Sequence, residues 1–443
     1  MGLNHNYHHS HVSTNFKHLR QSLTKEVLSI QKPLRMIIAS MALYMFGWGF
    51  ADPFLSVYLS TFADDYSTIG DYHSYGSIAA LFVLFFIAEL IERTRVDKML
   101  NFIKCAYAFV GVSYFIAGIT QSLTILIPTI IVHGILASSV WSTASALMRE
   151  IAKPKEVNMT WGLYHAARNL AFVCGIAIAL IFVSRLPIYY IFVPIIIFPP
   201  LSVLLTKKID SGVEKEPFSV AIKDIVIKDK LIMRFFYDLR EMKKEIWFMY
   251  IMQFFHYAIY SVMYTFLPLF AVSQGYGIMG IGLLVLVSHV PFLFSFVAAE
   301  MADSSERMMN IIFGFAISAT GFFLLSFWNT TGFALAVGIF VIMSGVALLA
   351  PSIAGMVTML APRKASGTTS VMMSYMMFSS SAVISPIMGR LVDSYDWSQT
   401  FAILGSAFIL ITMMVVAIRW YFHRQNMIYH INHPTSKKQP YIL

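Results

Sequence analysis

The sequence has little charge and almost no cysteine. Of its 443 residues, 12% are charged and 58% are hydrophobic, and the mean hydropathy is +0.68. Soluble domains are typically about 25% charged, so a water-soluble fold could not hide this much apolar surface. The two cysteines, Cys105 and Cys174, lie in separate apolar segments and exclude a disulfide framework and a cysteine-based metal site. We expect neither a metal nor a cofactor.

Motifs of nucleotide-driven pumps and of hydrolytic enzymes are also missing. The sequence contains no Gly-Lys-Ser/Thr phosphate-binding loop, which argues against pumping driven by ATP. It contains neither an HExxH motif nor a nucleophile elbow. We therefore do not expect an enzyme.

Long apolar segments are abundant instead. A membrane-spanning helix needs about 20 mostly apolar residues, and about twelve segments approach that length. They are Met36–Leu59, Gly76–Ile91, Met99–Ile119, Leu123–Leu147, Leu163–Val183, Ile188–Leu205, Ile246–Val272, Ile281–Met301, Ile311–Phe327, Phe333–Leu360, Val371–Val392 and Phe401–Trp420. Because none alternates polar and apolar residues as a β-barrel strand does, we predict an all-α integral membrane protein with twelve transmembrane helices.

The basic residues indicate the orientation in the membrane. With the N-terminus in the cytoplasm, about 30 of the 32 Lys and Arg residues fall on that side, and essentially Arg185 and Arg390 lie outside. This asymmetry predicts that both termini are cytoplasmic, and we expect a multi-pass protein of the plasma membrane. The formal net charge of +9 is then an orientation signal, with membrane lipid as a partner and no nucleic acid.

The chain divides into two weakly similar halves. Ala88-Glu89-Leu90 recurs as Ala299-Glu300-Met301, and Phe54-Leu55 recurs as Phe266-Leu267, at a shared offset of about 211 residues. We predict two pseudo-symmetric six-helix bundles, because parallel repeats with a substrate path between them are a transporter design. The expected parts are a cytoplasmic tail (1–33), a first bundle (34–205), a cytoplasmic linker with surface helices (206–245), a second bundle (246–420) and a cytoplasmic tail (421–443).

The loop after the second expected span reads Ala-Glu-Leu-Ile-Glu-Arg-Thr-Arg-Val at positions 88–96. It resembles the marker of the major facilitator superfamily, Gly-x-x-x-Asp-Arg-x-Gly-Arg, with an acid at Glu92 and the basic Arg93, although both glycines are replaced. The counterpart after the eighth span keeps Asp303 and Arg307. The resemblance covers Pro33–Trp420 and implies the fold of that superfamily, in which the first, fourth, seventh and tenth helices line a central cavity.

A polar stripe runs along the first expected span. Tyr44, Trp48 and Asp52 are four residues apart and share one helix face. A charge at membrane depth costs at least about 2.5–3.5 kcal/mol on insertion scales, so Asp52 is a candidate for binding a proton or the substrate. The alternative is a local bond to backbone groups that the kink at Pro53 sets free.

The seventh and fourth spans offer matching residues. At the repeat offset the seventh span presents His256, Tyr260 and Tyr264, which suggests that the two stripes face one cavity, although aromatic stripes also arise from packing alone. The fourth span adds His133 and Trp141. His133 could carry a coupled proton, because histidine titrates near physiological pH, or it could be a structural histidine.

Charged residues at the cytoplasmic helix ends are a second candidate group. By resemblance they would close an inner gate that opens when the bundles rock; they are Glu89, Glu92, Arg93, Asp303 and Arg307. The alternative is a solvated charge cluster, which contributes little by itself. Arg168, inside the fifth span, needs an acidic partner, and Glu89 is a candidate by depth alone.

These observations predict a secondary active transporter. It would move a small organic solute by alternating access, coupled to protons as a symporter or an antiporter. A uniporter and a non-transporting receptor or scaffold on the same fold are the alternatives. A membrane-embedded enzyme is disfavoured, because the intramembrane His and Asp residues are scattered over several helices without a motif. The sequence names no substrate.

Overall fold

A computed structural model describes residues 30–151, 157–183, 185–207, 244–295, 307–328, 331–361 and 366–432, together with Ile209, Arg240 and Met242. Helices dominate these ranges. The first half contains α2 (Lys32–Leu59), α3 (Tyr66–Arg93), α4 (Val96–Thr120), α5 (Leu123–Ile151), α6 (Val157–Val183), the 3-10 helix η1 (Ile188–Phe192) and α7 (Val193–Thr206). The second half contains α10 (Lys244–Ser273), α11 (Ile278–His289), the 3-10 helix η2 (Val290–Phe294), α13 (Arg307–Phe327), α14 (Gly332–Leu360), α15 (Ser366–Ser394) and α16 (Trp397–Asn432).

The all-α membrane architecture is confirmed. Within the described ranges, eleven helices are long and apolar enough to cross a bilayer, and a shorter apolar helix covers Ile278–Phe294 where the eighth span is expected. Only helices and closed barrels satisfy every backbone polar group inside lipid. A chain of long apolar segments without strand-like alternation is therefore restricted to a helical bundle.

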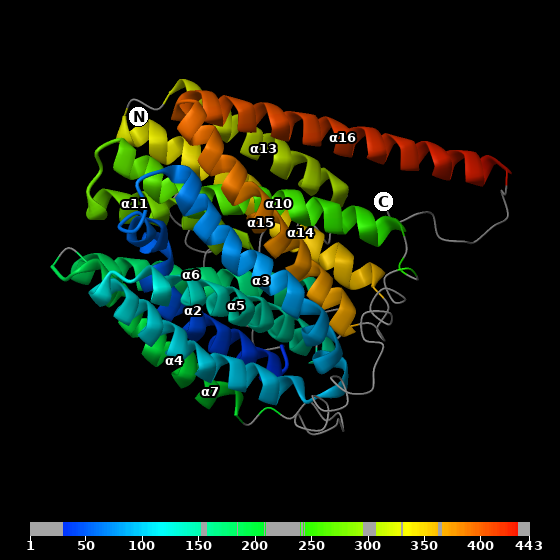
Figure 1. Cartoon of the computed structure of the whole chain (residues 1–443). Helices are drawn as coiled ribbons and strands as arrows, with labels where there is room; N and C mark the ends of the chain where they lie inside the picture. Colours follow the sequence, from blue (N-terminus) through cyan, green and yellow to red (C-terminus); the bar gives the residue numbers. More distant parts are fainter. Residues whose placement is uncertain are drawn as a thin grey trace, which may run out of the picture.

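The two halves of the chain form two groups of helices (Figure 1). Helices α2, α4, α5, α6 and α7 lie on one side, and α10, α11, α13, α14 and α16 lie on the other. Helices α3 and α15 pack along each other between these groups, and α6 contacts α11, η2 and α14. The boundary between the groups therefore runs along α3–α15 and α6–α11.

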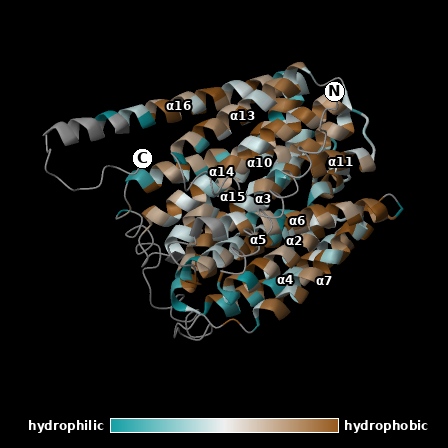
Figure 2. Cartoon of the chain, turned by 180° about the vertical axis from the view of Figure 1, so that it is seen from behind, coloured by the Kyte–Doolittle hydropathy of each residue, from teal (hydrophilic) through white to brown (hydrophobic). Residues whose placement is uncertain are grey.

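The outward faces of the helices are apolar. Large hydrophobic side chains such as Phe82, Phe109, Leu204 and Leu410 are at least 66% exposed. Figure 2 shows hydrophobic residues along most of the helix length, with hydrophilic residues more frequent near helix ends. In a soluble protein such a surface would aggregate. Here it is the surface that faces lipid.

Several helices differ from the expected spans at their ends. Helix α3 begins at Tyr66 rather than near Gly76, because the Asp65 side chain accepts a hydrogen bond from the Thr68 backbone N–H at 2.6 Å and caps the helix. Helix α16 continues to Asn432, past the expected end of the last span at Trp420. The surface helices expected in the linker lie outside the described residues.

Candidate functional site: a cavity between the two bundles

A cavity of about 240 Å³ lies between the two groups of helices. Its walls come from the helices at the first, fourth, seventh and tenth expected spans (α2, α5, α10 and α14) and also from α3, α4, α6, α15 and η2. Residues from both halves of the sequence thus enclose one space, as a substrate path between two repeats requires.

All eight residues expected along the substrate and proton pathway line this cavity. They are Tyr44, Trp48, Asp52, His133, Trp141, His256, Tyr260 and Tyr264. The matched stripes of α2 and α10 therefore meet in space. What these residues do in transport stays a prediction.

The first bundle contributes a continuous aromatic wall. The Trp48 ring stacks on the His133 ring with centroids 4.5 Å apart and planes 15° apart. The Tyr114 hydroxyl lies 3.0 Å from His133 Nδ1, and Tyr44 packs edge-on against Trp141 at 6.5 Å. His133 therefore has a ring partner and a hydrogen-bond partner within its own bundle, an arrangement that also suits a structural histidine.

The second bundle contributes a shorter aromatic wall on α10. The Tyr260 and Tyr264 rings stack at 4.6 Å, and the Tyr264 hydroxyl lies 3.4 Å from His289 Nε2. His256 lies about one turn before Tyr260 on the same helix. It is 3% exposed, and neither of its ring nitrogens has a hydrogen-bond partner. The facing aromatic walls leave a slot suited to a flat or apolar solute body.

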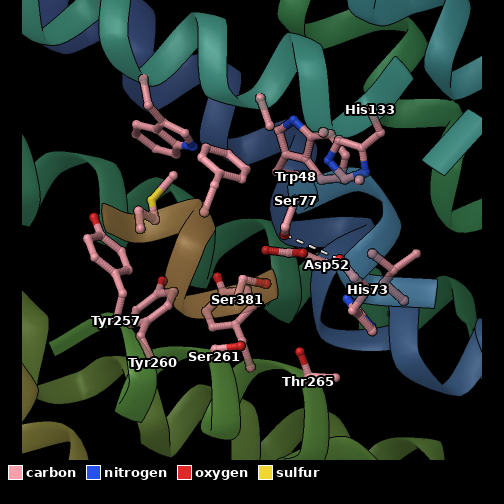
Figure 3. Close-up of a pocket in the computed structure, with 18 of the residues that line it drawn as sticks. Trp48, Asp52, His73, Ser77, His133, Tyr257, Tyr260, Ser261, Thr265 and Ser381 are labelled. Carbon is pink, nitrogen blue, oxygen red and sulfur yellow. Dashed lines mark hydrogen bonds between the residues drawn. The ribbon is translucent and has the colours of Figure 1, made fainter. Parts of the chain in front are cut away.

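Asp52 lies at one end of the cavity with several small polar groups. In Figure 3 its side chain lies beside Ser77 and His73 of α3, with Ser261 and Thr265 of α10 across the space. Tyr257 lies toward the opposite end in this view. The carboxylate thus reaches the cavity rather than the lipid, as a proton- or substrate-binding group must.

Arg168 lies at a different level of the same cavity. Its guanidinium carbon is 4.8 Å from the centre of the Trp141 ring and 5.7 Å from that of Tyr164. These cation–π contacts replace the acidic partner that the sequence suggests for it. Glu89, the candidate partner, forms an ion pair with Arg93 one turn further along α3.

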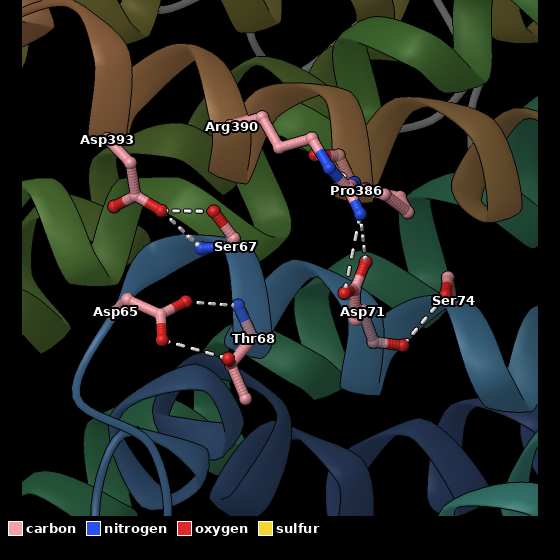
Figure 4. A network of polar contacts seen from close by, with 8 residues as sticks. All are labelled: Asp65, Ser67, Thr68, Asp71, Ser74, Pro386, Arg390 and Asp393. Atoms are coloured by element: carbon pink, nitrogen blue, oxygen red, sulfur yellow. Dashed lines mark hydrogen bonds and ion pairs between the residues drawn. The ribbon is translucent and has the colours of Figure 1, made fainter.

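Polar contacts join α3 and α15 at the ends that the charge asymmetry predicts to be extracellular (Figure 4). The Asp393 carboxylate accepts hydrogen bonds from the backbone N–H groups of Tyr66 and Ser67 at 3.2 and 2.8 Å, and from the Ser67 hydroxyl. Arg390 pairs with Asp71 at 3.3 Å. We call these five residues the outer latch.

Glycine lets the helices approach closely at the outer latch. A side chain on Gly389 of α15 would collide with the Tyr66 backbone of α3, and one on Gly70 would collide with the Ser385 carbonyl. Small residues at such positions allow backbones to pack directly in membranes. The α3–α15 boundary is therefore held by backbone proximity as well as by charge.

Three of the predicted gate residues lie at the other end of α3, and one of them reaches across the boundary. Glu92 Oε1 accepts a hydrogen bond from the Gly367 backbone N–H of α15 at 2.6 Å. Glu89 and Arg93 pair within α3. Arg307, at the start of α13, contacts the Met359 sulfur in its own bundle. Asp303 lies outside the described residues.

Two hydrogen bonds that the sequence reasoning missed lie toward the same end. Arg149 of α5 donates to the Thr358 hydroxyl of α14 at 3.2 Å, and Ser142 of α5 donates to Ser374 of α15 at 2.8 Å. Both bonds cross between the bundles. In the sequence, Arg149 is one of several basic residues of an expected cytoplasmic loop. Its partner lies in the other bundle, so only the structure identifies it.

Further lining residues were also missed. His73 was missed because the expected second span began at Gly76, and the capping pattern at Asp65–Thr68 is the signal that would have extended it. Ser77 lies within the expected span and was not singled out. His165 lies one turn before Arg168 on α6, a spacing that places both side chains on one helix face. That spacing could have been read from the sequence.

Comparison with known proteins defines the class. The family model described as Major Facilitator Superfamily matches residues 37–386, most of the chain. The chain belongs to the major facilitator superfamily of membrane transporters. No curated protein matches the chain.

Three solved structures illustrate the similarity. The human organic anion transporter MFSD10 (TETRAN) is 13% identical with a TM-score of 0.64, covering 87% of this chain and 99% of that one. The proton:xylose symporter XylE is 13% identical with a TM-score of 0.65, covering 87% and 95%. A POT family transporter in complex with a thioalcohol-conjugated peptide is 14% identical with a TM-score of 0.67, covering 87% and 96%. At these identities the likeness shows the fold alone.

Proposed function

We propose that this protein is a secondary active transporter that moves a small organic solute by alternating access. The observation that carries the proposal is the cavity between the bundles, in which the Asp52 carboxylate of α2 and the aromatic side chains of α10 line the same space. The neighbouring structures are of transporters for organic anions, xylose and a peptide-like ligand, which supports transport and leaves the substrate open.

The two bundles would exchange access by rocking about this cavity. Opening toward the outside breaks the outer latch, while opening toward the inside breaks the contacts of Glu92 and Arg149 across the boundary. Each group consists of a few exposed or half-buried polar contacts, so each can break at a modest cost in free energy. In this scheme the termini face the cytoplasm and the membrane is the plasma membrane.

Asp52 is the group that would couple transport to protons. It is the carboxylate that lines the cavity within the described residues, so it is the acidic group there that can take up a proton on one side of the membrane and release it on the other. His133 is the second candidate, but its ring already stacks on Trp48 and lies within hydrogen-bond distance of Tyr114.

Counterflow in proteoliposomes tests the proposal. The purified protein is reconstituted and screened with labelled sugars, amino acids, monocarboxylates and nucleosides, with and without a pH gradient. We expect saturable exchange of one solute class, and accumulation that follows the pH gradient and is lost in Asp52→Asn. Exchange that ignores the gradient in both proteins indicates a uniporter. Saturable binding without any flux indicates a receptor and refutes transport.

A further inference from the structure

A buried cation lines the cavity without an acidic partner among the described residues. The Arg168 side chain is on a residue only 9% exposed. Its guanidinium lies over the rings of Trp141 and Tyr164, and its Nε has no hydrogen-bond partner. No carboxylate of the described residues forms an ion pair with it. Charged groups inside a membrane protein normally pair with one another or face a ligand path, so Arg168 calls for an anion.

Two imidazoles that line the same cavity also have ring nitrogens without a hydrogen-bond partner. His165, one turn earlier on α6, is 8% exposed and its Nδ1 makes no hydrogen bond; His256 of α10 is 3% exposed and neither ring nitrogen makes one. All three residues line the cavity. More than about 90% of buried backbone groups, and most buried side-chain polar atoms, are paired in folded proteins. Several unpaired polar groups that line the same cavity as a cation indicate that a ligand satisfies them.

This cluster is separated from Asp52 along the cavity. The Tyr44 ring contacts that of Trp141, over which the Arg168 guanidinium lies. Tyr44 and Asp52 lie two turns apart on α2, which is about 12 Å along the helix axis. An anionic group at Arg168 therefore leaves the Asp52 end free for a proton or for the far end of the solute.

We propose that Arg168, His165 and His256 form an anion pocket that binds the carboxylate of the transported solute, and that the substrate class is a small organic monocarboxylate with an apolar or aromatic body. The guanidinium fork matches a carboxylate with two parallel hydrogen bonds, and imidazole N–H groups supply further donors. The walls of Trp141, Tyr257 and Tyr260 receive the body. The cavity volume of about 240 Å³ is below the roughly 300–1,000 Å³ of sites for drug-sized ligands, so the cavity suits a small solute. The assignment rests on the proposed transport function.

The first test compares two probes of the same shape and different charge. The melting temperature of the detergent-purified wild-type protein is measured with sodium benzoate and with benzamide at matched ionic strength. We expect benzoate to raise the melting temperature and benzamide to leave it unchanged. Equal shifts from both probes, or a shift from neither, would overturn the anion pocket.

The second test removes the cation. Arg168→Met is expected to weaken benzoate binding about 10- to 100-fold, the range for a lost hydrogen bond to a charged group, and Arg168→Lys to weaken it less. The matched control is Arg185→Gln, at an exposed position outside the cavity, which should bind benzoate like the wild type. A folded Arg168→Met protein with wild-type benzoate affinity contradicts the proposal. If that variant does not fold, the comparison of benzoate with benzamide decides alone.

The anion pocket and the transport function can fail separately. If benzoate binds, Arg168→Met abolishes that binding, and no solute shows flux in proteoliposomes, the anion pocket is supported and transport is refuted. Saturable flux of a neutral solute, with no thermal shift from benzoate, refutes the anion pocket and leaves transport in place.

Discussion

Removing the Asp393 carboxylate should release the outer latch and shift the protein toward an outward-open state. This carboxylate binds the N-terminus of α3 from the other bundle, through the Tyr66 and Ser67 backbone N–H groups and the Ser67 hydroxyl. A side-chain cap at a helix N-terminus is worth about 0.5–2 kcal/mol, and a negative charge there adds about 0.3–1 kcal/mol at an exposed site. Because these contacts are solvent-exposed, we estimate about 1–2 kcal/mol for Asp393→Ala, or roughly a 5- to 30-fold shift in the equilibrium.

Cysteine accessibility measures this shift. Thr265 lines the cavity and is 4% exposed, so a cysteine there reacts slowly unless the cavity opens. The two native cysteines, Cys105 and Cys174, are first replaced by serine. We expect a membrane-impermeant thiol reagent, added from the side predicted to be extracellular, to label Thr265→Cys about 5 to 30 times faster when Asp393→Ala is present.

The chain offers a matched control for this experiment. Asp396, close to Asp393 in sequence, accepts a hydrogen bond from the Gln399 backbone N–H at 2.7 Å and so caps α16 within its own bundle. Asp396→Ala should leave the labelling rate unchanged. The reasoning is refuted if Asp393→Ala changes the rate by less than about twofold, or if Asp396→Ala accelerates labelling equally.

Three further predictions follow from single contacts. Asp52→Asn should abolish the response of uptake to a pH gradient in proteoliposomes while counterflow continues; a preserved response would exclude Asp52 as the coupling group. Gly134→Ala should lower the melting temperature, because the added Cβ would collide with the backbone of α3, at a cost of about 1–3 kcal/mol. The control is Gly277→Ala, whose Cβ would meet no atom within 4 Å and which should leave the melting temperature unchanged. Lys104 is fully buried and donates to the Ser40 hydroxyl at 2.6 Å. Ser40→Ala should therefore destabilise the protein by about 1–3 kcal/mol. Lys104→Met should destabilise it by less, since an apolar replacement leaves no buried charge unpaired. Chemical denaturation of both variants checks the order, and the reverse order contradicts it.

Part of the candidate site was readable in advance, for a geometric reason. Tyr44, Trp48 and Asp52 are four residues apart, so they share one face of a helix whatever surrounds that helix. The repeat offset then points to His256 and Tyr260 as their counterparts. The first inference depends on local periodicity and the second on the internal repeat, and a single sequence contains both.

Other features depend on which helices become neighbours. The pairing of Asp71 with Arg390, and the capping of α3 by Asp393, join residues more than 300 positions apart, and no local pattern specifies such a contact. The same holds for Arg168. Its depth indicates a need for a partner, but only the structure shows that aromatic rings, those of Trp141 on α5 and of Tyr164 on α6 itself, occupy the position expected for a carboxylate.

The sequence by itself determined the membrane class, the helical secondary structure and the division into two halves. The first two follow from hydrophobic length and from the requirement that backbone groups be satisfied inside lipid, and the division into halves follows from the internal repeat. Only the tertiary structure decided which polar side chains share the cavity and which stay without partners there. A side chain's burial and its hydrogen-bond partners are set by helices distant in sequence, as for His256 and Arg168. The interpretation of Arg168, His165 and His256 as an anion pocket therefore comes from packing and not from a motif.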